Sequence, residues 1–104
     1  PTKKPGLDFV KKFEGKYGPG TRSLFAGTAW DALLLLQQAA SVSLKKAQPG
    51  TPEFRSALRD ALENTQNFVA SEAVYNMSPT DHNGVDQRSQ VMVRIQDGKW
   101  KLVN

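Results

Sequence analysis

The sequence contains no cysteine, and this absence removes several classes of protein at once. Without thiols there is no disulfide scaffold, no thiolate metal site and no cysteine nucleophile. The absence of cysteine does not identify the redox compartment, because proteins of the bacterial periplasm often lack cysteine too. Histidine is almost as scarce, since the chain has only His82, which follows Asp81 in a turn-forming stretch. We therefore predict that His82 is a turn residue, and we predict no metal site and no cofactor.

Long apolar runs are also missing. The longest strongly apolar run is the five-residue stretch 32–36, whereas a membrane span needs about 20 apolar residues, so this run predicts a buried helix. Residues 1–6 lack the apolar core of a secretion signal, so the signal of an exported protein would lie outside this sequence. With 104 residues, the chain has room for one small domain.

Blocks of one charge are absent as well. Fourteen Lys and Arg against ten Asp and Glu give a formal net charge of +4, but the two signs are interspersed. This distribution favours a solvated surface over a nucleic-acid interface.

A catalytic constellation is not visible in the sequence. Asp60 and Glu63 fall on the predicted exposed face of a helix, near two arginines, where solvated ion pairs are expected. Glu72 precedes a predicted strand and is either a buried partner or an edge charge. The Gly18–Gly20 segment has neither the spacing nor the lysine of a phosphate loop. We predict that the chain is not an enzyme.

Three helices are predicted from periodicity and capping signals. Apolar residues spaced four apart predict the first over 7–17, and a Gly-Pro-Gly sequence ends it. Thr28 is a plausible N-cap of the second, which should run to about 44–46. Thr51 and the proline after it open the third, which should fray near 64–67.

The second predicted helix is apolar over most of its circumference. Such a helix needs more cover than two short neighbours can provide. This is the first indication that the chain packs against structure it does not encode.

A β-hairpin is the clearest local signal, at the end of the chain. Asp97-Gly98 is a two-residue loop of type I′ chemistry between two strand-like runs, 90–96 and 99–103. The turn pairs Ile95 with Trp100 and places five apolar residues on one face: Val91, Val93, Ile95, Trp100 and Leu102. Short extended pieces are predicted before it, at 68–69 and 74–77. A hairpin with one apolar face requires a layer beneath it.

Three stretches resemble a known family in their order and spacing. Residues 9–18 (FVKKFEGKYG) resemble its aromatic helix ending in Tyr-Gly, residues 29–40 its A-Y-D-A helix, and residues 56–63 (SALRDALE) its L-R-D-A-L-E helix. The segments 75–84 and 98–103 follow in the same order. The family is that of the type I periplasmic binding proteins, the branched-chain amino acid (Leu/Ile/Val) group that serves ABC importers.

The resemblance implies an α/β fold class and a segment of a larger, two-lobed protein. The chain would be its C-terminal part, seen as three helices, short strands and a C-terminal β-hairpin. Residues 7–66 would supply helices to one lobe, and residues 68–104 would cross back to the other. The implied location is periplasmic or extracytoplasmic. The implied partners are an amino acid or related carboxylate ligand and an ABC transporter permease, with no nucleic acid and with self-association of the segment.

The resemblance also implies where a ligand would bind. In the family, the residues just before the A-Y-D-A helix reach the cleft, and these match Phe25, Ala26, Gly27 and Thr28. A backbone amide or the Thr28 hydroxyl at a helix start could bind a carboxylate, although Thr28 could instead be only a cap. The sequence departs from the family at three places: Gly27 replaces an aromatic contact of some members, Trp30 a tyrosine, and Glu72 a common glycine. These departures leave the ligand class open.

Two alternative functions, each of a different class of protein, also fit parts of the sequence. A winged-helix nucleic-acid-binding domain has the same order of three helices and a hairpin, but acidic residues lie on the outward side of its would-be recognition helix. A small enzyme or accessory domain would require catalysis that depends on Asp81 or His82.

Overall fold

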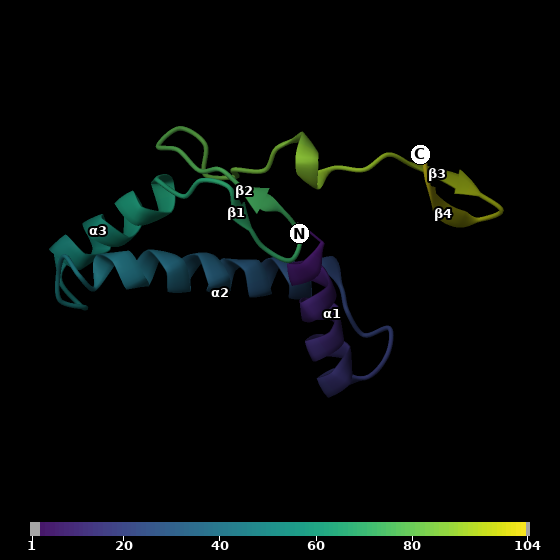
Figure 1. Ribbon diagram of the computed structural model, residues 1–104, viewed down its shortest axis with the longest axis horizontal. Coiled ribbons are helices and arrows are strands. Elements are labelled where there is room, and N and C mark those ends of the chain that lie inside the picture. The colour runs from purple at the N-terminus through teal and green to yellow at the C-terminus, as the bar shows by residue number, and fades with distance from the viewer. Residues whose placement is uncertain (1–2, 104) are drawn as a thin grey trace.

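A computed structural model describes residues 3–103; Pro1, Thr2 and Asn104 lie outside the described part. Its elements follow the order α1 (Lys4–Tyr17), α2 (Leu24–Ser43), α3 (Pro52–Glu63), β1 (Phe68–Val69), β2 (Val74–Tyr75), a 3₁₀ helix (Gln87–Ser89), β3 (Val93–Gln96) and β4 (Lys99–Leu102). The α/β class, with three helices before short strands and a terminal hairpin, is the predicted one (Figure 1).

Helix α1 begins three residues earlier than predicted, with a proline in its first turn. Its stripe is the expected one: the rings of Phe9 and Phe13 lie 5.4 Å apart and those of Phe13 and Tyr17 4.7 Å apart. The helix ends at Gly18, whose φ of 98° is in the left-handed region that glycine adopts at little cost. The Gly18 N–H donates to the Glu14 carbonyl, as in a helix cap.

The predicted start of the second helix at Thr28 is wrong. Helix α2 begins at Leu24, and the N-cap is Ser23, whose hydroxyl accepts a hydrogen bond from the Ala26 N–H. Thr28 lies one turn inside and donates its hydroxyl to the carbonyls of Leu24 and Phe25, which is how threonine behaves within a helix. The sequence offered two possible caps, and the extended backbone at Ser23 (φ −143°) decides between them.

Helix α3 has the predicted cap and lies alongside the C-terminal half of α2. The Thr51 hydroxyl accepts from the Phe54 N–H, and Pro52 occupies the first turn. Ala39 in α2 and Ala57 in α3 are both buried, because small side chains let the two helices approach closely.

The strands form two separate antiparallel pairs. In the first pair Phe68 lies opposite Tyr75, and in the second Ile95 lies opposite Trp100, as the two-residue loop predicted. Asp97 and Gly98 both have positive φ, 54° and 71°, which type I′ turns require. The predicted hairpin register is confirmed.

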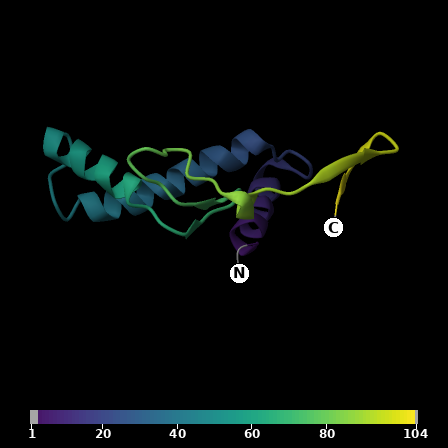
Figure 2. The ribbon, with the colours of Figure 1, turned by 90° about the horizontal axis from the view of Figure 1, so that it is seen from above.

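The molecule is elongated, and its hairpin stands apart from the helices. The radius of gyration is 16.6 Å, whereas a compact domain of this length has about 13 Å. Figures 1 and 2 show β3 and β4 at the opposite end of the long axis from α3. Every residue of β3 and β4 is exposed, including Trp100 at 73%. The layer that the apolar face of the hairpin requires is therefore not provided by residues 3–103.

Candidate functional site

The main polar cluster joins α2 to the loop between β1 and β2. Its centre is Asp31, which is only 1% exposed. One carboxylate oxygen accepts from the N–H (2.7 Å) and the hydroxyl of Ser71. The other accepts from the Glu72 N–H at 2.9 Å and the Tyr75 hydroxyl at 3.1 Å. Four donors therefore converge on one buried carboxylate, which offsets the cost of removing it from water.

The same loop places Glu72 against the first turns of α2. Gly27 is buried, and a Cβ built on it would lie 1.8 Å from Oε1 and 2.7 Å from Cγ of Glu72. The Glu72 side chain therefore occupies the space that any larger residue at position 27 would need. Two departures from the family pattern, Gly27 and Glu72, meet here.

This contact predicts a coupled pair of substitutions. Gly27→Ala within a helix normally adds about 1 kcal/mol of stability, but here the new methyl group must displace Glu72. We expect that gain to appear fully only in a Glu72→Ala background, with a coupling energy of about 1 kcal/mol. Urea denaturation of the wild type, both single variants and the double variant measures it. Strict additivity would contradict the contact.

Burial also changes the acidity of two groups in the cluster. Desolvation, with a smaller contribution from the Asp31 charge, raises the pKa of Glu72 above its usual value. Desolvation and then the charge and hydrogen bond of Asp31 raise the pKa of Tyr75 to about 12. Both shifts favour the neutral form, because a negative charge there would be partly removed from water and would also lie near the buried carboxylate of Asp31.

The raised pKa of Glu72 predicts a pH dependence of stability. Because the folded chain binds this proton more tightly than the unfolded chain, stability should fall as pH rises from about 4.5 through the raised folded pKa. Glu72→Gln should therefore stabilise the chain at pH 7 and give no advantage at pH 3.5. Denaturation at the two pH values measures the difference. Glu53→Gln, in the exposed first turn of α3, should have the opposite sign at pH 7, because it removes a charge that favours the N-terminus of the helix.

A hollow of about 380 Å³ lies beside the cluster, at the start of α2. It is lined by α1 and by the segments on either side of the cluster: Gly6, Phe9, Val10, Arg22, Ser23, Leu24, Ser71 and Glu72. Arg22 is held at its rim by Glu14, whose carboxylate is 2.9 Å away and also accepts from the Gly20 N–H. The hollow combines a guanidinium, a carboxylate and hydroxyls, the groups that orient a polar ligand.

The predicted ligand-binding residues have different environments. Phe25 is 83% exposed. Gly27 is covered by Glu72, and its N–H donates to the Ser23 carbonyl. The Thr28 hydroxyl is bonded to two carbonyls of the preceding turn. Of these three residues, only Phe25 therefore has a side chain that makes no hydrogen bond within the helix and is exposed.

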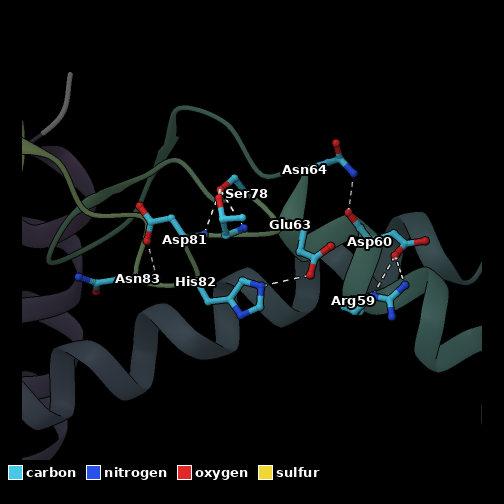
Figure 3. A network of polar contacts seen from close by, with 9 residues as sticks. Arg59, Asp60, Glu63, Asn64, Ser78, Asp81, His82 and Asn83 are labelled. Atoms are coloured by element: carbon cyan, nitrogen blue, oxygen red, sulfur yellow. Dashed lines mark hydrogen bonds and ion pairs between the residues drawn. The ribbon is translucent and has the colours of Figure 1, made fainter.

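Figure 3 shows a second polar cluster, between α3 and the turn-rich segment after β2. The His82 Nε2 lies 3.1 Å from Oε1 of Glu63. Asp81 does not orient this ring, because its carboxylate accepts from the N–H groups of Asn83 and Gly84 within its own turn. His82 is a turn residue, as predicted. The Asp60 carboxylate pairs with its neighbour Arg59 on the exposed face of α3. Among residues 3–103, no cluster of three His, Asp or Glu could hold a metal ion.

Sequence reasoning missed the roles of Asp31, Ser71 and Tyr75. One signal was available: Asp31 is the single charged residue in a largely apolar helix. A buried acid of this kind requires donors from another segment. Which segment supplies them could not be found locally, because Ser71 is 40 residues away.

Comparison with solved structures identifies the fold. An extracellular ligand-binding receptor from Rhodopseudomonas palustris matches 99% of this chain with 48% identity and a TM-score of 0.87. A receptor of the same description from strain HaA2 matches with 45% identity and a TM-score of 0.87, and another with 36% and 0.82. Over almost its whole length, this chain is similar to one part of these receptors. The predicted resemblance to the type I periplasmic binding proteins is thereby confirmed.

The chain spans about 29% of the length of the receptors that it matches. No protein-family model and no curated protein matches it. None of the helices described here is long and apolar enough to cross a membrane. The winged-helix alternative is wrong, because the fold is that of the receptors and the hairpin stands apart from α2 and α3.

Proposed function

We propose that this receptor segment serves an extracytoplasmic solute-binding protein that delivers a small molecule to an ABC transporter permease. The observation that supports it is the 48% identity, over 99% of the chain, with an extracellular ligand-binding receptor. The role is binding rather than catalysis. The class of solute that we propose is an amino acid or related carboxylate.

The proposed ligand site is the start of α2. Phe25, Gly27 and Thr28 lie on its first two turns, next to the hollow lined by Arg22 and Glu72. The corrected helix start moves the free N–H groups from Thr28 to Leu24 and Phe25, where no intrahelical carbonyl is available. A solute carboxylate would be stabilised there by the helix dipole, and Phe25 would provide an apolar contact. Gly27 would act by leaving room for Glu72.

The proposed arrangement in the whole receptor has two lobes. Residues 7–66 would belong to one lobe, and residues 68–104 would cross to the other. The separation of the hairpin from the helices supports the crossing of the hairpin (Figure 1), whereas Ser71 and Glu72 stay bound to Asp31 of α2. The ligand would then bind where the lobes meet, so the chain by itself should bind solutes weakly.

The experiment uses a chimera in which this chain replaces the matching part of the R. palustris receptor of 48% identity. Isothermal titration calorimetry with amino acids and carboxylates should find a solute that the isolated chain does not bind. Phe25→Ala should weaken that binding, because the proposed aromatic contact with the solute is lost. Phe54→Ala, on α3, is the control on general folding. A folded chimera that binds no member of either class would contradict the proposed solute class.

A further inference from the structure

Another hollow lies between α3 and the turn-rich segment after β2, and we call it the α3 hollow. Its volume is about 390 Å³, within the range of small-molecule sites, about 300–1,000 Å³. It shares no residue with the hollow beside the proposed solute site. Figure 1 shows α3 and α1 near opposite ends of α2, so the two hollows lie on different parts of the molecule.

The floor of the α3 hollow is apolar and is held in place by hydrogen bonds. Leu58 and Leu62 lie one turn apart on α3, and Met77 lines the same hollow from the segment after β2. The Met77 N–H donates to the Thr65 carbonyl at 2.8 Å, and its carbonyl accepts from the Gln66 side chain at 2.8 Å. The three apolar side chains are half-buried, so a ligand that covered them would remove further apolar surface from water.

Two guanidinium groups lie on the rim of this hollow. Arg55 and Arg59 are one turn apart on α3 and both line it. Arg59 already pairs with Asp60 at 2.7 Å. Arg55, in contrast, forms no ion pair within residues 3–103, and its guanidinium donates a long hydrogen bond of 3.5 Å to the Gly50 carbonyl. An exposed guanidinium beside an apolar floor is suited to the charged end of an organic anion.

The other side of the rim carries the pair of His82 and Glu63, whose side chains point toward each other in Figure 3. The Glu63 side chain is only 16% exposed, and its carboxylate lies 3.1 Å from the His82 ring. Because this carboxylate would repel a second negative charge, the anionic end of a ligand is directed away from it and toward Arg55. The apolar body then lies between Arg55 and the pair, over the apolar floor.

We propose that the α3 hollow binds a small organic anion with a compact apolar body, an alkyl or aryl carboxylate. The body packs on Leu58, Leu62 and Met77, and the carboxylate pairs with Arg55. Such a ligand joins α3 to the segment after β2, so its binding stabilises this part of the fold. The site is separate from the proposed solute site, and the proposal does not rest on the proposed function.

The test uses 3-phenylpropionate as the probe and 3-phenylpropanamide, which is similar in shape but uncharged, as its matched control. Each compound is titrated into the ¹⁵N-labelled chain and followed by NMR. Saturable shifts should map to the amides of residues 55–63 and 77–83. The carboxylate should bind about fivefold more tightly than the amide, because an ion pair at an exposed site contributes about that factor.

Variants of the rim and of the floor separate the two parts of the site. Arg55→Gln should weaken binding of the carboxylate about fivefold and leave binding of the amide unchanged, and Arg55→Lys should restore part of the loss. Leu58→Gln should weaken binding of both compounds, because the floor becomes polar. Arg94→Gln, which removes an exposed guanidinium from the hairpin, should change neither.

The chimera described above provides a second arm, in which calorimetry replaces NMR and the rest of the receptor is present. Arg55→Gln should again weaken binding of 3-phenylpropionate, whereas Phe25→Ala, at the proposed solute site, should leave this binding event unchanged. A chimera that binds the probe in this way but binds no solute at the start of α2 would count against the proposed function alone.

Four results would overturn the proposal. The first is the absence of saturable shifts with the carboxylate, and the second is shifts that map to residues 93–102 of the hairpin instead. The third is equal affinity for the carboxylate and the amide, which would remove the role of Arg55. The fourth is a chimera whose binding of the probe does not respond to Arg55→Gln, since the α3 hollow would then be closed in the receptor.

Discussion

Replacing Asp31 by alanine should lower the free energy of unfolding by about 3 kcal/mol or more, because each donor that stays buried without an acceptor costs about 1–3 kcal/mol. The carboxylate is 1% exposed and accepts from two groups of Ser71, the Glu72 N–H and the Tyr75 hydroxyl. Alanine leaves these donors without an acceptor in a site with little water. The loop between β1 and β2 should then detach from α2.

Two measurements test this expectation. Urea denaturation followed by circular dichroism gives the loss of stability, and hydrogen exchange should show loss of protection at the Ser71 and Glu72 amides. Asp60→Ala is the matched control, because that carboxylate is exposed and pairs only with Arg59 on the surface, so it should cost less than about 1 kcal/mol. Equal losses from the two variants would show that Asp31 does not hold the loop.

Replacing Phe9 by alanine should cost about 3–5 kcal/mol, the range for a large cavity in a core. Phe9 is 4% exposed and joins α1 to α2, since its ring lies 5.9 Å from that of Trp30. It also contacts Phe13 within α1. Because few other large side chains in the described part are as deeply buried, the loss should separate the two helices.

Phe25→Ala provides the matched control for this variant. The residue type and the substitution are the same, but Phe25 is 83% exposed, so the change should alter stability by no more than about 0.5 kcal/mol. Thermal denaturation of the two variants measures the contrast. If Phe9→Ala were as mild as Phe25→Ala, the packing of α1 on α2 would be wrong.

Some hydrogen bonds of the candidate site join residues that are close in the sequence, and others join residues that are far apart. The turn at Asp81 and the caps of α1 and α3 were predictable, because each hydrogen bond joins residues two to four apart. The acceptor role of Asp31 was not, because its donors come from a loop 40 or more residues later. The same distance explains why the sequence left Glu72 open between a buried partner and an edge charge. In the structure Glu72 combines features of both alternatives. It is exposed overall, but its side chain lies against Gly27.

The error at Thr28 has a different cause. Ser23 and Thr28 are both good capping residues, and the segment between them is compatible with either helix or loop. The choice depends on the chain leaving α1, where Glu14 holds Arg22 and fixes the approach to Ser23. The capping and helix propensities of residues 23–28 depend only on neighbours in the sequence, so they do not reflect a contact between two elements.

By itself, the sequence determined the type and order of the elements, the register of the hairpin and the resemblance to the receptors. These follow from periodicity, caps and the Asp97-Gly98 turn, all of which act between residues that are close along the chain. Only the tertiary structure decided where α2 begins, which donors Asp31 receives and which apolar faces stay open. Those depend on which distant segments share space, and the free energy of burying a side chain is set by these neighbours rather than by the residue's own type.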